Sequence, residues 1–245
     1  MSPSVPTGAE IEENISLCYS SLAGTDNDNL DSSARSVGLV HQELMLDELA
    51  IEQCICWDDL TNNFLGVCCE HSHEIPLDFT SERELDILCD AIADKKVHLA
   101  SKATVAGLGA LLAIPHEYSV RPIMFSGTCK REGGPHHACI IQTILNATNN
   151  VNTRKKHNYC TVCIASDGKA KRIDALMILT MSSQLSASSP IYGLLSSLKF
   201  MNHLIGPDDI TPDKDFKHVF KRQRNLLMRH KGVLIQGFCV TPAIL

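Results

Sequence analysis

Residues 44–51, LMLDELAI, form a short apolar run interrupted by two acids, and its length favours a buried strand over a helix. Residues 159–167, YCTVCIASD, form a second β-rich run that ends on Asp167. The segments between and after these runs alternate between strand-like and helical patterns without an internal repeat. This order is typical of an α/β domain built around a mixed sheet with flanking helices.

The rest of the chain supplies the other elements of such a fold. The turn-like residues 60–62 separate two strand-like runs, which predicts a hairpin over 54–70. Ser81 and Glu84 have the spacing of a capping box ahead of an amphipathic period, which predicts a helix over 81–95. We expect further strands at 103–114 and 121–127, and further helices at 135–150, 169–181, 190–204 and 215–231.

The first 36 residues differ in composition from the rest of the 245-residue chain, whose length suits one or two domains. They contain six acids against Arg35 and therefore account for most of the formal net charge of −6. They are rich in Ser, Asn, Asp, Gly and Pro and show no sustained apolar period. We therefore predict a mostly disordered acidic tail over 1–36, with the folded unit over 37–245, beginning near Val37.

The cellular compartment of the protein can be inferred from its targeting signals, its apolar runs and its cysteines. No basic segment followed by an apolar one opens the sequence, and the longest apolar run, 103–114, is too short to span a bilayer. Eleven cysteines without an export signal fit reduced thiols. We expect a nuclear or cytoplasmic protein, neither secreted nor bound in a membrane.

Two strand aspartates are the candidate metal ligands. Strand alternation places Asp47 on one face with Met45, Leu49 and Ile51, where an ionised carboxylate is costly unless a cation compensates it. Asp167 ends a second apolar strand, the position at which open α/β sheets bind ligands. Together they predict a Mg²⁺ (or Mn²⁺) site. The alternatives are that Asp47 faces solvent on an edge strand and that Asp167 belongs to a simple turn.

A basic helix is expected over 215–231. Its apolar residues fall on one side of a helical wheel, so we expect that side to dock on the protein. The cationic side predicts contact with a phosphate backbone, although a solvated helix face is the open alternative. The candidate nucleic-acid-binding residues are Lys217, His218, Lys221, Arg222, Arg224, Asn225 and Arg229.

Three segments resemble the P-element-like transposases, including the THAP-domain members, and related transposon-derived proteins of fungi. The first is LMLDELAIEQCICWDDLTNNFLGV (44–67), an aspartate strand followed by an aromatic-Asp pair and a hairpin that ends in Phe-x-Gly. The second is VCIASDGKAKR (162–172). The third matches the family's D-x-x-H-x-x-K-x-x-R-N run position for position, at Asp215, His218, Lys221, Arg224 and Asn225.

The resemblance implies an RNase H-like fold and an ancestral two-metal chemistry of DNA cleavage and strand transfer, with Asp47 and Asp167 as the first two catalytic carboxylates. This chain departs from the family at Arg172, where an Asn is common. The family also places a nucleotide-binding insertion and a catalytic glutamate after the D-x-x-H run.

Here Leu245 ends the chain soon after the insertion region would begin, at about residue 232, and no acid follows Asp215. Asp213 or Asp215 is the minor candidate for a third ligand. We therefore expect a C-terminally incomplete core that is inactive alone and binds DNA weakly and without sequence preference.

A binding module without catalysis is the rival hypothesis. One hairpin region concentrates soft ligands that suit a structural Zn²⁺, although their spacing matches no common zinc pattern. These residues are Cys54, Cys56, Cys68, Cys69, His71 and His73.

Overall fold

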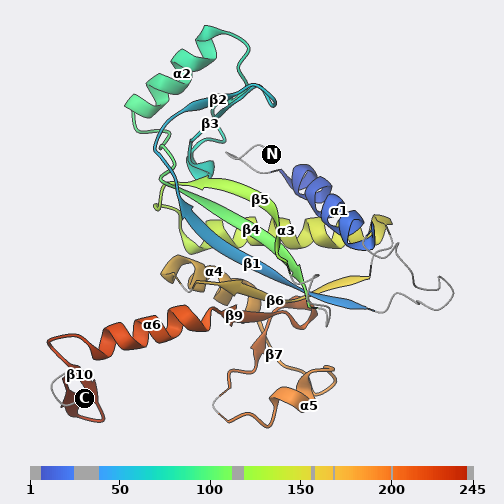
Figure 1. Cartoon of the computed structure of the whole chain (residues 1–245), viewed down its shortest axis with the longest axis vertical. Helices are drawn as coiled ribbons and strands as arrows, with labels where there is room; N and C mark the ends of the chain where they lie inside the picture. The colour runs from blue at the N-terminus through green and yellow to red at the C-terminus, as the bar shows by residue number, and fades with distance from the viewer. Residues whose placement is uncertain are drawn as a thin grey trace.

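The computed structural model describes residues 7–24, 39–111, 119–155, 158–167, 169–199 and 201–241. Its centre is a five-stranded sheet in the order β5 (Arg121–Thr128), β4 (Lys102–Ala110), β1 (Val40–Ala50), β6 (Tyr159–Ser166) and β9 (Thr211–Lys214). Figure 1 shows β1 in the middle of this sheet, between β4 and β6.

Strand direction confirms the predicted fold class. β1 is antiparallel to β4, and β4 is antiparallel to β5, whereas β6 is parallel to β1 and β9 is parallel to β6. Three antiparallel strands extended by two parallel ones, with helices in the connections, form the RNase H-like mixed sheet that the sequence predicts. The β6 strand has the predicted bounds, and the predicted strands at 103–114 and 121–127 correspond to β4 and β5 over the described residues.

The two faces of the sheet have different surroundings. On β1, Gln42, Leu44 and Leu46 are buried on one face, whereas Asp47 and Leu49 on the other face are exposed. Three helices cover the buried face: α1 (Gly8–Gly24), α3 (Gly134–Lys155) and α4 (Ala170–Thr180). The main core therefore lies between these helices and the sheet.

The prediction of a mostly disordered acidic tail over 1–36 is wrong for residues 8–24. Ile11, Ile15 and Tyr19 of α1 are almost completely buried in the main core, because their spacing of four places them on one side of the helix. Thr7 and Glu10 form a capping box at its start, with the Thr7 N–H donating to Glu10 Oε2 at 2.9 Å. Residues 1–6 and 25–36 of the predicted tail lie outside the described residues.

A second, smaller core lies beyond the end of β5. It contains the predicted hairpin, β2 (Cys56–Asp58) and β3 (Asn63–Leu65), a 3-10 turn η1 (Cys69–His71) and the predicted amphipathic helix α2 (Glu82–Ala93). Phe64, Val67 and Leu88 are buried in it. Gly66 has a φ of 94°, and a Cβ there would lie 1.9 Å from the Cys54 carbonyl oxygen, so only glycine fits this position.

After α4 the chain forms short elements and not the helix predicted over 190–204. These are β7 (Ser183–Gln184), α5 (Tyr192–Leu195), β8 (Leu204–Ile205) and η3 (Pro207–Asp209). Gly193, Ser196 and Ser197 have low helix propensity, and the helix there is limited to the single turn of α5. Just before the segment, Ser186 hydrogen-bonds Ser188, and the Ser189 hydroxyl donates to Asp209 Oδ2 at 2.6 Å. Phe200 lies outside the described residues.

The last elements are α6 (Phe216–Leu227) and the hairpin of β10 (Val233–Ile235) and β11 (Phe238–Val240). In Figure 1, α6 projects from the edge of the sheet and carries this hairpin at its far end. The helix ends earlier than the predicted residue 231. Among the described helices, none combines the length and the hydropathy that a membrane crossing requires.

Candidate functional site

A cavity of about 550 Å³ lies on the sheet face opposite the main core. Strand residues of β1, β4, β6 and β9 line it, together with the first turn of α6. Its acidic lining residues are Glu43, Asp47, Asp167, Asp213 and Asp215. We call this space the acidic cavity.

Asp47 and Asp167 come together because β1 and β6 are neighbouring parallel strands. Leu46 pairs with Ser166 in the register, so the next residue of each strand is one of the two aspartates. Both line the acidic cavity, on the same side of the sheet. Asp47 is exposed, and its Oδ1 accepts a hydrogen bond of 2.7 Å from the Glu48 N–H.

Two basic side chains already compensate the negative charge of Asp167. Its Oδ1 lies 3.5 Å from Arg172 Nη1, and its Oδ2 lies 3.3 Å from Lys169 Nζ. Burial opposes ionisation of Asp167, but the charges of Arg172 and Lys169 and the Lys169 N–H outweigh it and hold the pKa of Asp167 below its usual value. Asp167 therefore takes part in an ion-pair network that its position in the sequence does not reveal.

Arg172 is the centre of this network. It lies in the first turn of α4 and is 2% exposed. Its Nη1 donates to the Leu46 carbonyl oxygen at 3.1 Å, and its Nη2 lies 3.6 Å from Glu48 Oε1. Glu48 also pairs with Lys169. Because Arg172 joins the backbone of β1 to the end of β6, it fixes the two strands at the level of the aspartates.

A second pair of carboxyl groups that line the cavity consists of Glu43, which is buried on β1, and Asp213, which is exposed on β9. Burial, followed by the charge of Asp213, raises the pKa of Glu43. Burial and the charge of Glu43 also raise the pKa of the neighbouring Cys163 thiol to about 12. Sequence reasoning missed Glu43, although strand alternation places it on the same face as Asp47.

Asp215 and His218 of the D-x-x-H run have a structural role at the start of α6. Asp215 is the N-cap residue, and its Oδ1 accepts from the Lys217 N–H at 2.8 Å. Its Oδ2 lies 2.7 Å from His218 Nδ1, and this contact lowers the pKa of Asp215. The run therefore begins α6 at the end of β9, beside the acidic cavity.

The expectation that the apolar side of α6 docks on the protein is wrong for the chain as described. No residue of the helix is buried, and Phe216 and Phe220 are each 65% exposed. The physical reason is that α6 leaves the sheet edge, so its apolar residues border two open cavities and no core. Val219 and Leu226 line a cavity that includes Ile173 of α4, and Phe216 lines the acidic cavity.

That second cavity, also about 550 Å³, separates the predicted nucleic-acid-binding residues into groups. Arg222, Asn225 and Arg229 line it together with Asp167, which therefore borders both cavities. His218 lines the acidic cavity. Lys217, Lys221 and Arg224 line neither of the two cavities and are exposed. The basic helix thus presents cations both beside Asp167 and towards solvent.

Comparison with known proteins gives one similar fold. No protein-family model matches the chain, and no curated protein matches it. Among solved structures, the Drosophila P element transposase strand transfer complex is similar, with a TM-score of 0.45 and 13% identity. The similarity covers 97% of this chain and 48% of the other, so this chain spans about half of that protein's length.

The predicted soft-ligand residues form separate groups. The Sγ atoms of Cys54 and Cys56 lie 3.4 Å apart on the hairpin, and Cys69 Sγ lies 3.4 Å from His136 Nε2. His73 contacts the Cys69 carbonyl oxygen. Cys68 and His71 instead meet Cys129, which follows β5. Sequence reasoning missed Cys129, because it lies 58 residues after His71 and only the fold brings it close.

Proposed function

We propose that this chain is a transposon-derived RNase H-like domain that binds DNA through phosphate contacts and holds Mg²⁺ or Mn²⁺ weakly at Asp47 and Asp167. One observation carries the proposal. Carboxylates from three adjacent parallel strands, β1, β6 and β9, line a single cavity at whose edge a basic helix begins. The carboxyl ends of neighbouring parallel strands are where α/β sheets bind ligands.

The donor set fits a hard divalent cation. Carboxylate oxygens are the ligands that Mg²⁺ and Mn²⁺ prefer, and the five acidic side chains that line the cavity offer them. Asp47 and Asp167 would hold the ion, with Asp213 as the nearest additional acid on β9. When bound, the ion would supply positive charge at a phosphate oxygen.

Arg172 and Lys169 already pair with Asp167, so we propose that a metal ion binds there only weakly and that the chain alone does not cleave DNA. An ion that binds Asp167 has to compete with two cations that already pair with it. Among the described residues, the cavity carboxylates form no group of three with oxygens within 4.8 Å of one another. A two-metal reaction needs enough carboxylate oxygens to hold both ions in place.

The cations of α6 support the DNA-binding part of the proposal. Three cations of α6 are exposed and line neither cavity: Lys217, Lys221 and Arg224. A phosphate backbone can therefore reach them without rearrangement of the fold. Backbone contacts of this kind carry no sequence information. Binding is therefore non-specific and falls steeply with salt.

The proposal is tested by a cleavage and binding assay on the purified chain. Duplex, nicked and hairpin DNA are incubated with Mg²⁺ or Mn²⁺, next to an Asp47→Ala variant and a variant with Asp86→Ala on the exposed face of α2. We expect DNA binding by all three proteins and cleavage by none. Turnover that Asp47→Ala abolishes and Asp86→Ala retains would show a complete catalytic site. Absence of DNA binding at low salt would contradict the function as a whole.

A further inference from the structure

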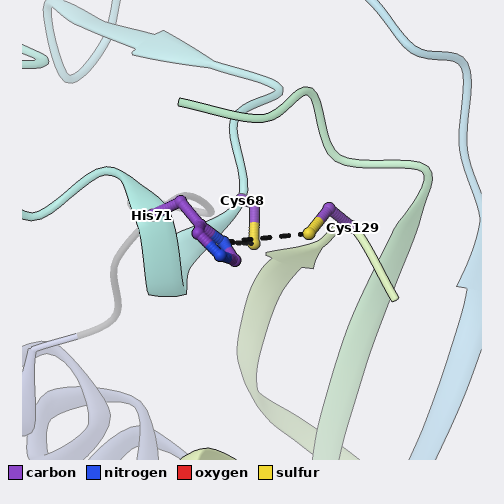
Figure 2. A group of neighbouring side chains, drawn as sticks. All are labelled: Cys68, His71 and Cys129. Carbon is purple, nitrogen blue, oxygen red and sulfur yellow. Dashed lines mark hydrogen bonds between the residues drawn. The ribbon is translucent and has the colours of Figure 1, made fainter. Parts of the chain in front are cut away.

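Three ligand atoms of the kind that zinc prefers converge where the smaller core meets the end of β5. His71 Nδ1 lies 3.3 Å from Cys68 Sγ and 3.8 Å from Cys129 Sγ, and the three atoms all lie within 4.8 Å of one another. Figure 2 shows the imidazole of His71 and the thiol of Cys129 directed towards Cys68. We call this group the Cys-His-Cys cluster.

These separations agree with a tetrahedral zinc centre. Zinc–sulfur bonds of about 2.3 Å and zinc–nitrogen bonds of about 2.0 Å place sulfur and nitrogen ligands roughly 3.5 Å apart. The two sulfur-to-nitrogen distances of the cluster, 3.3 and 3.8 Å, lie on either side of that value. A cation at the centre therefore needs only small side-chain shifts.

The backbone holds the cluster in place independently of any ion. The Cys68 N–H donates to the His98 carbonyl at 2.8 Å, and the Ser101 N–H donates to the Thr128 carbonyl at 2.9 Å. A Cβ on Gly127 would lie 2.5 Å from the Val67 carbonyl oxygen, so the end of β5 is in close contact with the segment that carries Cys68. The ligands are thus preorganised by main-chain pairing.

A buried carboxylate beside the thiols is a second, independent observation. Glu132 is 1% exposed, and its Oε1 lies 3.0 Å from Cys68 Sγ and accepts from the Cys129 N–H at 2.6 Å. Burial of a carboxylate is costly without a nearby cation. Its position next to two of the three ligand residues is where a zinc ion would compensate this charge.

We propose that Cys68, His71 and Cys129 supply three of the four ligands of one tetrahedral Zn²⁺, with water in the fourth position and the carboxylate of Glu132 beside the site. On binding, both thiols release their protons to solvent and ligate as thiolates, and the neutral imidazole ligates through Nδ1. The ion joins η1 of the smaller core to the loop after β5. The site is separate from the acidic cavity and takes a soft cation, not Mg²⁺.

The experiment measures zinc content and affinity in the purified full-length chain. After dialysis, metal analysis is expected to find one zinc per chain, lost in Cys68→Ser and in Cys129→Ser. Cys54→Ser and Cys89→Ser are the matched controls, because they remove thiols outside the cluster, and both should retain zinc. Glu132→Gln is expected to weaken zinc binding about 10- to 100-fold, and an unchanged affinity would remove Glu132 from the proposal.

Two measurements on the unaltered chain keep the proposal testable if a variant does not fold. Cobalt substitution should give the charge-transfer absorption of a thiolate-bound metal. Zinc should also protect the half-buried Cys129 from alkylation, while Cys54 and Cys89 stay reactive. Absence of stoichiometric zinc, a reactivity of Cys129 that zinc does not change, or a Cys68–Cys129 disulfide in the protein purified under reducing conditions would overturn the proposal.

Discussion

At the scale of single residues, Arg172 sets the charge around Asp167 at the edge of the acidic cavity. It pairs with both Asp167 and Glu48 while almost fully buried. A buried guanidinium between two carboxylates is a fixed counter-charge. We therefore regard Arg172 as a competitor of the divalent ion for Asp167.

The substitution Arg172→Asn should lower the stability of the fold and raise its affinity for a divalent metal ion. Removal of one partner from a buried ion pair costs about 3 to 5 kcal/mol, so urea unfolding should show a clear loss of stability. The same change releases Asp167, so Mn²⁺ affinity measured by calorimetry should rise. Arg83→Asn on the exposed surface of α2 makes the same change in charge and should alter neither quantity. Lower Mn²⁺ affinity in Arg172→Asn would contradict the competition.

Asp167 should also give the protein an acid-sensitive contribution to stability. Its pKa in the folded state is lowered from 3.8, so the contribution is present above pH 3.8 and is lost as the pH falls through the lowered folded-state value. An Asp167→Asn variant should therefore be less stable than the unaltered chain at neutral pH, and the difference should shrink in acid. Thermal unfolding across pH checks this, with Asp86→Asn as the exposed control.

At the scale of elements, α1 shows that a segment whose composition predicts disorder can still contribute buried residues to the core. The acidic, Ser- and Asn-rich context of residues 1–36 predicted disorder, yet the Thr7–Glu10 capping box and the spacing of Ile11, Ile15 and Tyr19 were readable signals of a helix. Ile15→Ala should destabilise the fold by about 2 to 5 kcal/mol because Ile15 is completely buried. Leu17→Ala, on the exposed side, should change stability by less than about 0.5 kcal/mol.

The basic helix α6 should control the salt dependence of DNA binding. Replacement of Lys221 and Arg224 by Ala removes two exposed cations and should reduce the slope of log affinity against log salt by about two. The matched control replaces Arg83 and Lys96 by Ala, on and just after α2. Fluorescence anisotropy with labelled duplex at several salt concentrations measures both slopes. Equal slopes in all three proteins would show that α6 is only a solvated surface.

Long, strongly patterned elements could be predicted from the sequence, and contacts between distant residues could not. The strand around Asp47 follows from the length of a short apolar run, and the strand before Asp167 follows from its β-rich composition. Because the two strands are neighbours, both predicted aspartates line the acidic cavity. The ion pairs of Arg172 and the meeting of Cys129 with His71 depend on tertiary packing. Local pattern also failed at 190–204, where Gly193, Ser196 and Ser197 weaken a helix.

At the scale of the whole molecule, the main and smaller cores have separate apolar clusters. The backbone pairing of Cys68 with His98 and of Ser101 with Thr128 lies between them. Elements with separate cores open as separate cooperative units. Amide hydrogen exchange should therefore show lower protection in α2 than in β1 and β6, and the difference should persist in the Arg83→Asn control. Uniform protection would contradict two separate units.

The central position of β1 has a consequence for how the protein is made. Both strands that pair with β1 come much later in the chain, β4 at 102–110 and β6 at 159–166. During translation an apolar strand therefore leaves the ribosome long before either neighbour exists, and it has open edges on both sides. Nascent chains that stop before Ser166 should remain bound to chaperones and sensitive to protease, and release should follow the emergence of β6.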